Sequence, residues 1–248
     1  MKAIILAAGE GRRLRPLTDD RPKCMVAYRG TPILEHILGT MRSCGISDIT
    51  VVTGYRADRI DYPDIAYRTN ERYGHTNMVA TLFCAEDDLQ DDDIILSYSD
   101  IVYRADVLQT LIDARDALCI VVDRAWKHLW QRRMPDPLAD AETMKIDSSG
   151  FIRELGKKPL SYQDIDAQYI GLIKLRANVL EQIKVFYHSL DRDAIYDGQP
   201  FEKMYMTSFI QCIIDRLMPA RAVPIDGGWI EVDSPEDLDI ELDWVTCR

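Results

Sequence analysis

Largely apolar runs alternate with amphipathic segments over the first half of the chain. Such runs predict strands that are covered on both faces, and they lie at residues 3–6, 48–53, 65–68, 93–98 and 118–123. Between them, apolar residues spaced three and four positions apart predict helices, at residues 31–45, 77–89 and 105–117. This alternation predicts an α/β protein with three α/β/α layers, in which helices cover both faces of a mostly parallel, mixed central sheet.

The regular alternation ends after residue 123. Residues 124–142 combine Trp126 and Trp130 with basic side chains and prolines, which predicts an irregular lid or insertion. Asp233-Ser234-Pro235-Glu236 predicts the start of a last helix, because serine caps helices and proline is favoured in their first turn. The segments between these two predict a partly antiparallel section, with strands at 151–154, 168–174, 222–225 and 229–232 and helices at 176–189 and 203–217.

A glycine-rich basic loop follows the first strand. Gly9 and Gly11 come directly after Ala7-Ala8, where small side chains let a ligand approach the backbone, and their amides can point at an anion. The glycines alone are more typical of an ordinary turn. The chain as a whole carries a formal net charge of −11, so a cationic loop indicates an anionic ligand. The basic residues of the loop are Arg12, Arg13, Arg15, Arg21 and Lys23.

Composition argues against several other classes of protein. The acidic net charge disfavours a general nucleic-acid binder, which needs a broad basic surface. The sequence contains neither a signal segment nor the roughly 18 uncharged apolar residues of a membrane span. We therefore expect a soluble, cytoplasmic protein with no nucleic-acid or membrane partner. The six cysteines lack metal-ligand spacing and are predicted to be reduced, mostly core thiols: Cys24, Cys44, Cys84, Cys119, Cys212 and Cys247.

The loop differs from a dinucleotide-binding fingerprint. That fingerprint requires a third glycine where Leu14 stands, and an acidic residue at the end of the second strand to hold a ribose. The sequence has Gly54-Tyr55 at the second place. An NAD-dependent enzyme is therefore excluded.

The string from Gly9 to Lys23 resembles the signature loop of a known enzyme family. These are the nucleotidyltransferases that couple a nucleoside triphosphate to a sugar phosphate, phosphocholine or phosphonate, and Arg12 stands where they usually have Ser or Thr. The matching positions are Gly9, Gly11, Arg13, Leu14, Pro16, Thr18, Pro22 and Lys23. The resemblance implies a Rossmann-like, GT-A-like single domain over residues 1–248, with a nucleotide-binding half (1–123), an acceptor-binding section (124–233) and a C-terminal helix (234–248).

Nucleotidyl transfer needs positioned cations more than covalent help from the protein. An acceptor phosphate oxygen attacks the α-phosphorus in line and pyrophosphate leaves, so the enzyme must align two anions and neutralise charge. The resemblance implies that Arg13 contacts the β- and γ-phosphates and that Lys23 spans the α-phosphate and the acceptor. Likewise, YSDI and EVDSPEDL resemble the family's two aspartate segments, which implies Asp100 and Asp233 as Mg²⁺ ligands and Asp100 as a catalytic residue.

Each of these two aspartates also has a purely structural interpretation. An aspartate after a strand is often a turn former, and one before Ser-Pro-Glu is often a helix cap. Both follow predicted strands, and the strand ends of an α/β sheet meet at one edge. We therefore expect Asp100 and Asp233 to converge.

Nucleotide recognition is assigned from the same resemblance. In the family, main-chain groups after the first strand bind the base, which maps onto Leu6, Ala7 and Ala8 beside Gly9 and Gly11. Asn77 resembles an asparagine of the phosphocholine cytidylyltransferases, and it fits a helix cap equally well. This kinship, together with a loop that suits a compact pyrimidine, favours CTP as the nucleotide.

The acceptor site departs from the sugar-phosphate branch of the family. Sugar-binding relatives carry an E-K-P element, whereas this chain has Lys157-Lys158-Pro159 and lacks the acid that would hold sugar hydroxyls. Aromatic rings and carboxylates can instead hold a cationic group, although the tryptophans equally fit packing positions under the lid. The predicted acceptor-binding residues are Trp126, Glu142, Lys158, Gln168 and Tyr169.

Together these features predict a Mg²⁺-dependent cytidylyltransferase. It would transfer CMP from CTP to a small phosphorylated or phosphonylated acceptor, and it would release pyrophosphate. Two alternatives stay open: a sugar-1-phosphate nucleotidyltransferase that uses dTTP, UTP or GTP, and a non-catalytic nucleotide-binding regulatory subunit. A homodimer is possible, and the sequence names neither the acceptor nor the oligomeric state.

Overall fold

The computed structural model describes residues 1–245, which form a nine-stranded mixed sheet as their main element. Strands β10 and β11 run antiparallel to their neighbours, and the pairs on the β1 side are parallel. The order across the sheet is β5 (Ala66–Thr69), β4 (Asp48–Thr53), β1 (Lys2–Ala7), β6 (Ile94–Tyr98), β11 (Gln168–Leu175), β8 (Leu118–Asp123), β14 (Ala220–Ile225), β10 (Phe151–Leu155) and β9 (Met144–Ile146).

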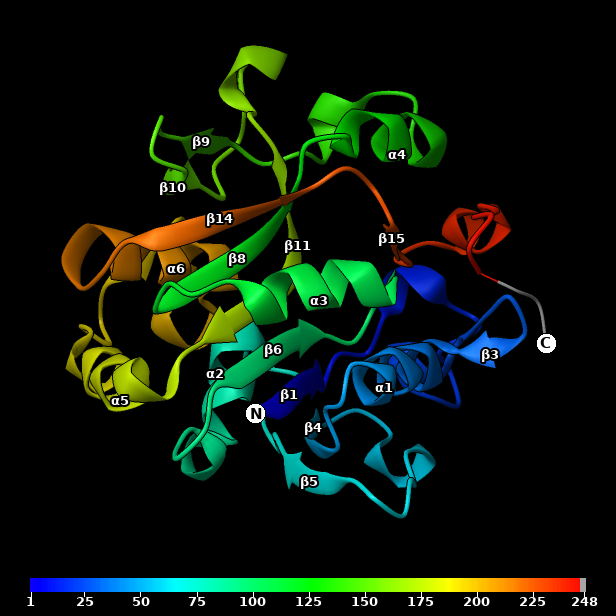
Figure 1. Cartoon of the computed structure of the whole chain (residues 1–248). Helices are drawn as coiled ribbons and strands as arrows, with labels where there is room; N and C mark the ends of the chain where they lie inside the picture. Colours follow the sequence, from blue (N-terminus) through cyan, green and yellow to red (C-terminus); the bar gives the residue numbers. More distant parts are fainter. Residues whose placement is uncertain (246–248) are drawn as a thin grey trace.

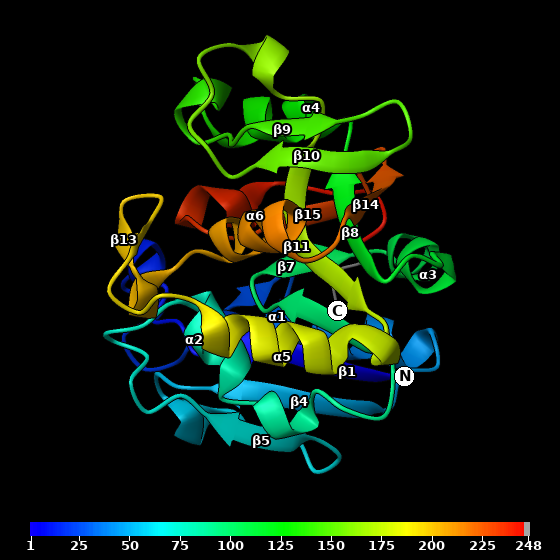
Figure 2. The ribbon, with the colours of Figure 1, turned by 90° about the vertical axis from the view of Figure 1, so that its left-hand side faces the viewer.

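Helices cover both faces of this sheet, as Figures 1 and 2 show. One layer contains α1 (Ile33–Ser43), α3 (Ala105–Asp113) and α4 (Trp126–Arg133), and the other contains α2 (Met78–Phe83), α5 (Leu180–Ser189) and α6 (Met206–Arg216). Both faces need cover because successive side chains of a strand point to opposite faces of the sheet. In β1, Ile5 packs into the core under α1, while Ile4 and Leu6 pack into the core under α2. The predicted α/β class is therefore confirmed.

A two-stranded antiparallel ribbon outside the main sheet brings two distant parts of the chain together. Strand β15 (Trp229–Glu231) pairs antiparallel with β7 (Ile101–Tyr103), so that Glu231 lies opposite Ile101. Two further ribbons are short: β2 (Ala27–Tyr28) with β3 (Thr31–Pro32), and β12 (Ile195–Tyr196) with β13 (Gln199–Pro200). Because β7 and β15 pair antiparallel, the residues just before β7 lie next to the residues just after β15.

Several predicted helices are shorter in the structure. The helix from residue 77 ends at Phe83, because the acidic run Glu86, Asp87 and Asp88 at its carboxyl end opposes the helix dipole and forms a separate 3₁₀ turn. Helix α3 ends at Asp113, where the buried Lys174 Nζ donates to the carbonyl oxygens of Ile112 and Ala114 at 2.7 and 2.9 Å.

Two predictions of local structure were wrong. The section from residue 124 is not irregular throughout, because residues 126–133 form helix α4, whose Trp126, Leu129 and Trp130 bury one face. The predicted C-terminal helix over 234–248 is only a 3₁₀ turn, Pro235–Asp239, within the described residues. The Ile240 carbonyl accepts a hydrogen bond from Tyr28 Oη at 2.6 Å instead of continuing that turn. Residues 246–248 lie outside the described part.

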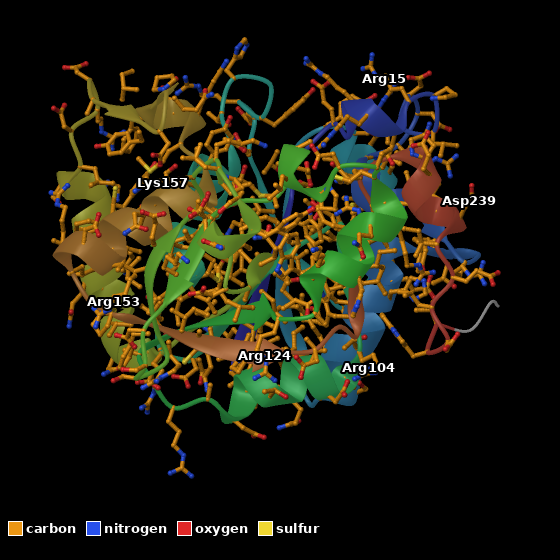
Figure 3. The ribbon with its side chains drawn as sticks, turned by 90° about the horizontal axis from the view of Figure 1, so that it is seen from above. Arg15, Arg104, Arg124, Arg153, Lys157 and Asp239 are labelled. Atoms are coloured by element: carbon orange, nitrogen blue, oxygen red, sulfur yellow. The ribbon has the colours of Figure 1, made fainter. Side chains whose placement is uncertain are left out.

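Basic side chains on the surface are distributed and paired with acids. Arg15, Arg153 and the neighbouring Arg104 and Arg124 lie on three different sides of the molecule in Figure 3, and each forms an ion pair with a nearby carboxylate. Among residues 1–245, no helix has both the length and the apolarity that a membrane crossing requires.

The cysteines are less buried than predicted. All five that the structure describes are free, but only Cys24 and Cys119 are buried. Cys44 and Cys212 are partly exposed and Cys84 is exposed, since each lies on or beside a helix rather than inside the sheet. Cys247 lies outside the described residues.

Helix α5 provides a matched test of the core beneath the sheet. Ile183 is 1% exposed and Val185, two positions on, is 59% exposed. Ile183→Ala is expected to lower the free energy of unfolding by about 2–5 kcal/mol, whereas Val185→Ala should change it by less than about 0.5 kcal/mol. Urea unfolding followed by circular dichroism measures both, and equal effects would contradict the packing described.

Candidate active site

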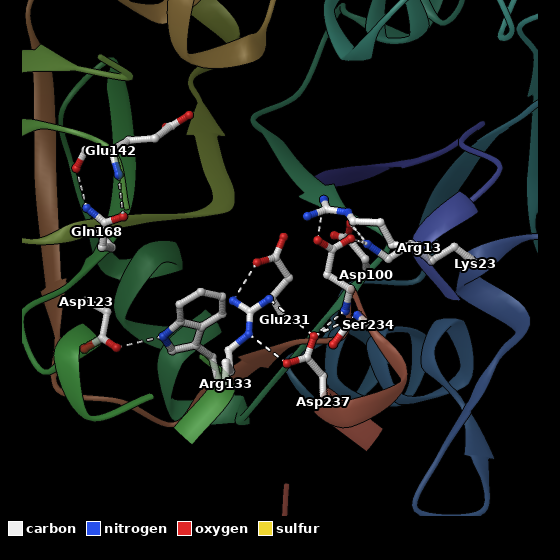
Figure 4. A network of polar contacts seen from close by, with 12 residues as sticks. Arg13, Lys23, Asp100, Asp123, Arg133, Glu142, Gln168, Glu231, Ser234 and Asp237 are labelled. Atoms are coloured by element: carbon white, nitrogen blue, oxygen red, sulfur yellow. Dashed lines mark hydrogen bonds and ion pairs between the residues drawn. The ribbon is translucent and has the colours of Figure 1, made fainter. Parts of the chain in front are cut away.

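Asp100 and Asp233 converge on one lysine. The backbone amide of Val232 donates to the Asp100 carbonyl oxygen at 2.8 Å and extends the β7–β15 pairing to the two acids. Lys23 Nζ then donates to Asp100 Oδ2 at 2.7 Å and to Asp233 Oδ1 at 2.6 Å, and the Arg13 guanidinium pairs with the other oxygen of Asp233 (Figure 4). The structure thus places four of the predicted site residues within one cluster.

The glycine-rich loop is folded so that Lys23 reaches this cluster. Gly11 has φ +64°, and a Cβ there would lie 2.7 Å from Lys23 Cβ, so the close approach requires glycine. Thr18 Oγ1 donates to the Gly11 carbonyl at 2.9 Å, and Leu14 is fully buried beneath the loop. Arg12, which departs from the family signature, pairs with Glu10 on the surface.

The electrostatic balance of the cluster keeps Lys23 charged. Burial by itself lowers the pKa of an ammonium group, but the carboxylates of Asp100, Asp233 and Glu231 outweigh it and raise the pKa of Lys23. The lysine is therefore a fixed cation between two acids at neutral pH.

Glu231 is a member of the cluster that the sequence analysis missed. One oxygen from each of Asp100, Glu231 and Asp233 can be chosen so that all three lie within 4.8 Å of one another. Burial raises the pKa of the Glu231 carboxyl to about 7, although its partner Arg133 opposes the shift. The signal was available, because residues two apart on an extended segment project to the same side.

The three carboxylates fit a divalent cation. Asp100 Oδ1 is buried without a hydrogen-bond partner among the described residues, which is an arrangement that a bound cation would satisfy. Hard cations such as Mg²⁺ prefer oxygen ligands and commonly need only one or two carboxylates besides phosphate oxygens and water. Asp100 and Asp233 therefore fit the metal role, with Glu231 beside them.

Two cavities flank this cluster. The smaller has a volume of about 120 Å³ and is lined by Leu6, Ala8, Gly9, Lys23, Asn77 and Asp100, among others. The larger has a volume of about 280 Å³ and lies toward α4 and β11. Its lining includes Arg13, Asn77, Trp130, Asp140, Glu142, Gln168, Tyr169, Tyr205, Trp229, Glu231 and Asp233.

The predicted nucleotide-binding residues fall into two groups. Leu6, Ala8 and Gly9 line the smaller cavity, whereas the Ala7 side chain points to the opposite core and Gly11 lies beneath Lys23. The Asn77 side chain caps helix α2 by accepting a hydrogen bond from the Met78 amide at 2.9 Å, and Asn77 also lines both cavities.

The predicted acceptor residues are only partly brought together. Glu142, Gln168 and Tyr169 line the larger cavity. The Gln168 side chain also holds the Glu142 backbone, donating to its carbonyl at 2.6 Å and accepting from its amide at 3.1 Å (Figure 4).

The other two predicted acceptor residues do not line that cavity. Trp126 is 4% exposed and packs between Trp130 and Tyr162, because the segment is helical rather than irregular. Lys158 Nζ donates instead to the carbonyl oxygens of Leu138 and Ala139, at 2.6 and 2.5 Å. Trp130, one helical turn after Trp126, is the tryptophan of α4 that lines the cavity.

Comparison with known proteins assigns the chain to a family. Residues 3–158 match the family model described as "MobA-like NTP transferase domain". The CTP:phosphoglutamine cytidylyltransferase of Campylobacter jejuni subsp. jejuni serotype O:2 is 47% identical over 253 residues, which cover 98% of this chain and 100% of that protein. The choline-phosphate cytidylyltransferase of Streptococcus pneumoniae is 35% identical over 99 residues, which cover 38% of this chain and 43% of that protein.

Solved structures agree on the fold. The inositol-1-phosphate CTP transferase from T. maritima superposes with a TM-score of 0.73 at 18% identity, over 95% of this chain and 90% of that chain. The CTP:phosphocholine cytidylyltransferase LicC from Streptococcus pneumoniae gives 0.69 at 22% identity, over 96% of both chains. The chain belongs to the MobA-like NTP transferase domain family and has the GT-A-like fold of the nucleotidyltransferases. It is a nucleotidyltransferase.

Asp100→Asn tests the carboxylate cluster. The substitution keeps the shape of the side chain but removes a charge that faces Lys23, so we expect nucleotidyl transfer to fall by at least about 100-fold. Far-UV circular dichroism should be unchanged. Asp226→Asn, which removes an exposed acid outside both cavities, is the matched control. Near-normal turnover of Asp100→Asn at ordinary Mg²⁺ concentration would contradict a role for Asp100 in the active site.

Proposed function

We propose that this protein transfers CMP from CTP to a small acceptor that carries a phosphate or phosphonate group, and releases pyrophosphate in a Mg²⁺-dependent reaction. The observation that carries the proposal is the convergence of Asp100 and Asp233 on Lys23 and Arg13. The choice of CTP is supported by 47% identity along the whole chain to a cytidylyltransferase.

The chain's own residues would align the two reactants. An oxygen of the acceptor phosphate forms a bond to the α-phosphorus, and the bond from that phosphorus to the bridging oxygen breaks to release pyrophosphate. The acceptor oxygen is already ionised, so no general base is needed. Lys23 would neutralise the α-phosphate and the acceptor phosphate, and Arg13 the departing β- and γ-phosphates.

The metal would complete this arrangement. Bound by Asp100 and Asp233, Mg²⁺ would supply further neutralisation of the charge that develops on the phosphate oxygens. Since Lys23 and Arg13 pair with these same carboxylates in the structure, both cations must shift their contacts toward phosphate when CTP binds.

The larger cavity favours an acceptor that carries an amine. Asp140, Glu142 and Glu231 line it together with several aromatic rings, and Arg13 is the one basic side chain among its described lining residues. Carboxylates and ring faces attract an ammonium group. An amino acid such as glutamine carries one, so phosphoglutamine, the substrate in the name of the Campylobacter relative, is the first acceptor to test.

An acceptor panel tests the proposal directly. The protein is incubated with Mg²⁺ and each of CTP, UTP, dTTP and GTP, together with phosphoglutamine, phosphocholine, 2-aminoethylphosphonate or glucose 1-phosphate, and pyrophosphate is followed. We expect release with CTP and an amine-bearing acceptor. Release only with glucose 1-phosphate would replace the proposal by the sugar-phosphate alternative. Nucleotide binding without any release would indicate a regulatory subunit.

Glu142 gives the acceptor step an expected pH dependence. Burial, followed by the negative charges of Glu231, Asp140 and Asp197, raises the pKa of Glu142 to about 7. The carboxyl is therefore mostly neutral at pH 6 and mostly ionised at pH 8, so the KM for an amine-bearing acceptor should fall about tenfold across that range. Glu142→Gln should raise the KM for the acceptor at pH 8 and weaken its pH dependence, while the KM for CTP stays unchanged; the remaining dependence is expected from Glu231, which lines the same cavity and whose pKa is also raised to about 7. A wild-type profile that the substitution does not alter would exclude Glu142 from acceptor binding.

A further inference from the structure

Arg133 connects the acceptor section to the metal carboxylates through buried ion pairs. It is the last residue of α4, and its side chain is 4% exposed. Nη1 donates to Glu231 Oε2 at 2.9 Å, and Nε and Nη2 donate to the two oxygens of Asp237 at 2.9 and 3.4 Å (Figure 4). One guanidinium therefore joins an acid of the cluster to an acid of the 3₁₀ turn that follows it.

Asp237 in turn holds the backbone at the second metal candidate. Its Oδ2 accepts hydrogen bonds from the amides of Asp233 and Ser234, at 2.8 and 2.9 Å. Its side chain is only 2% exposed, and the neighbouring Arg133 is part of what keeps the pKa of Asp237 low against the effect of burial. The direction in which the Asp233 carboxylate points thus depends on a side chain that Arg133 fixes.

The same helix forms a wall of the larger cavity. Trp130, one turn before Arg133, lines the cavity and packs against Trp229 of β15, with ring centroids 5.9 Å apart. The Arg133 guanidinium lies 5.2 Å from the centre of the Trp130 ring. Helix α4 therefore carries both a residue that lines the cavity, Trp130, and the residue that pairs with Glu231, Arg133.

We propose that Arg133 is a positioning residue for the transfer reaction. It orients Glu231 directly and Asp233 through Asp237, and so fixes the metal carboxylates relative to the acceptor cavity. Arginine suits this task better than lysine because its planar fork can serve one carboxylate with two N–H groups and a second with another. The inference rests on the proposed metal-dependent function, but its binding readout requires no turnover of an acceptor.

Arg133→Lys tests the proposal by metal binding. Lysine keeps the charge but cannot hold both acids in the same geometry. We expect the Kd for Mn²⁺, measured by electron paramagnetic resonance in the presence of CTP, to rise about tenfold or more, as for other residues that orient metal ligands. The Mg²⁺ concentration for half-maximal activity should rise in parallel, and excess Mg²⁺ should restore most of kcat.

Arg132→Met is the matched control on the same helix. Arg132 is exposed and donates to the Glu241 carbonyl at 2.7 Å, outside the cluster, so both metal readouts should stay at wild-type values. A folded Arg133→Lys protein with wild-type Mn²⁺ affinity would overturn the proposal, even if its activity were lost. If Arg133→Lys does not fold, Asp237→Asn is tested instead, by the same Kd for Mn²⁺ and the same Mg²⁺ concentration for half-maximal activity.

Failure of the proposed function would look different. A wild-type protein that binds no Mn²⁺ with CTP contradicts the metal-dependent reaction itself, and with it the role of Arg133. Wild-type binding of Mn²⁺ without turnover of any acceptor leaves the Arg133 measurement fully informative, because the affinity comparison requires no acceptor.

Discussion

Charge balance around buried carboxylates is the constraint on which the rest of this structure depends. Three acids whose nearest oxygens lie within 4.8 Å of one another would repel strongly in a low-dielectric setting. Lys23 and Arg13 offset that repulsion from the glycine loop, and Arg133 offsets it from helix α4. The cations therefore come from segments that are far apart in the sequence, and the fold brings them to the same group of carboxylates.

The topology of the sheet provides the geometry for that balance. After β14 the chain leaves the main sheet, and its next strand, β15, pairs with β7. This pairing places Asp233 beside Asp100 although the two residues are far apart in the sequence. Helix α4 contacts the same ribbon because the Trp130 ring packs against Trp229. A nucleotidyl transfer needs two anions held in line, and here Asp100 lines the smaller cavity while Asp233 lines the larger one.

The sequence predicted what depends on local pattern. Apolar runs located the parallel strands, with β4 and β8 at the predicted bounds, and the loop signature located Lys23 and Arg13. It failed where long-range packing decides. The tryptophan-rich segment is predicted to be irregular because of its basic side chains and nearby prolines, although Trp126, Leu129 and Trp130 have the spacing of one buried helix face. Trp126 is likewise predicted to bind the acceptor, whereas its ring packs between Trp130 and Tyr162.

Anomalous diffraction from crystals grown with CTP and Mn²⁺ tests the proposed site most directly. We expect a manganese peak bound by the carboxylates of Asp100 and Asp233, with the triphosphate in contact with Lys23 and Arg13. A manganese site remote from both aspartates, or CTP phosphates that touch neither Lys23 nor Arg13, would contradict it.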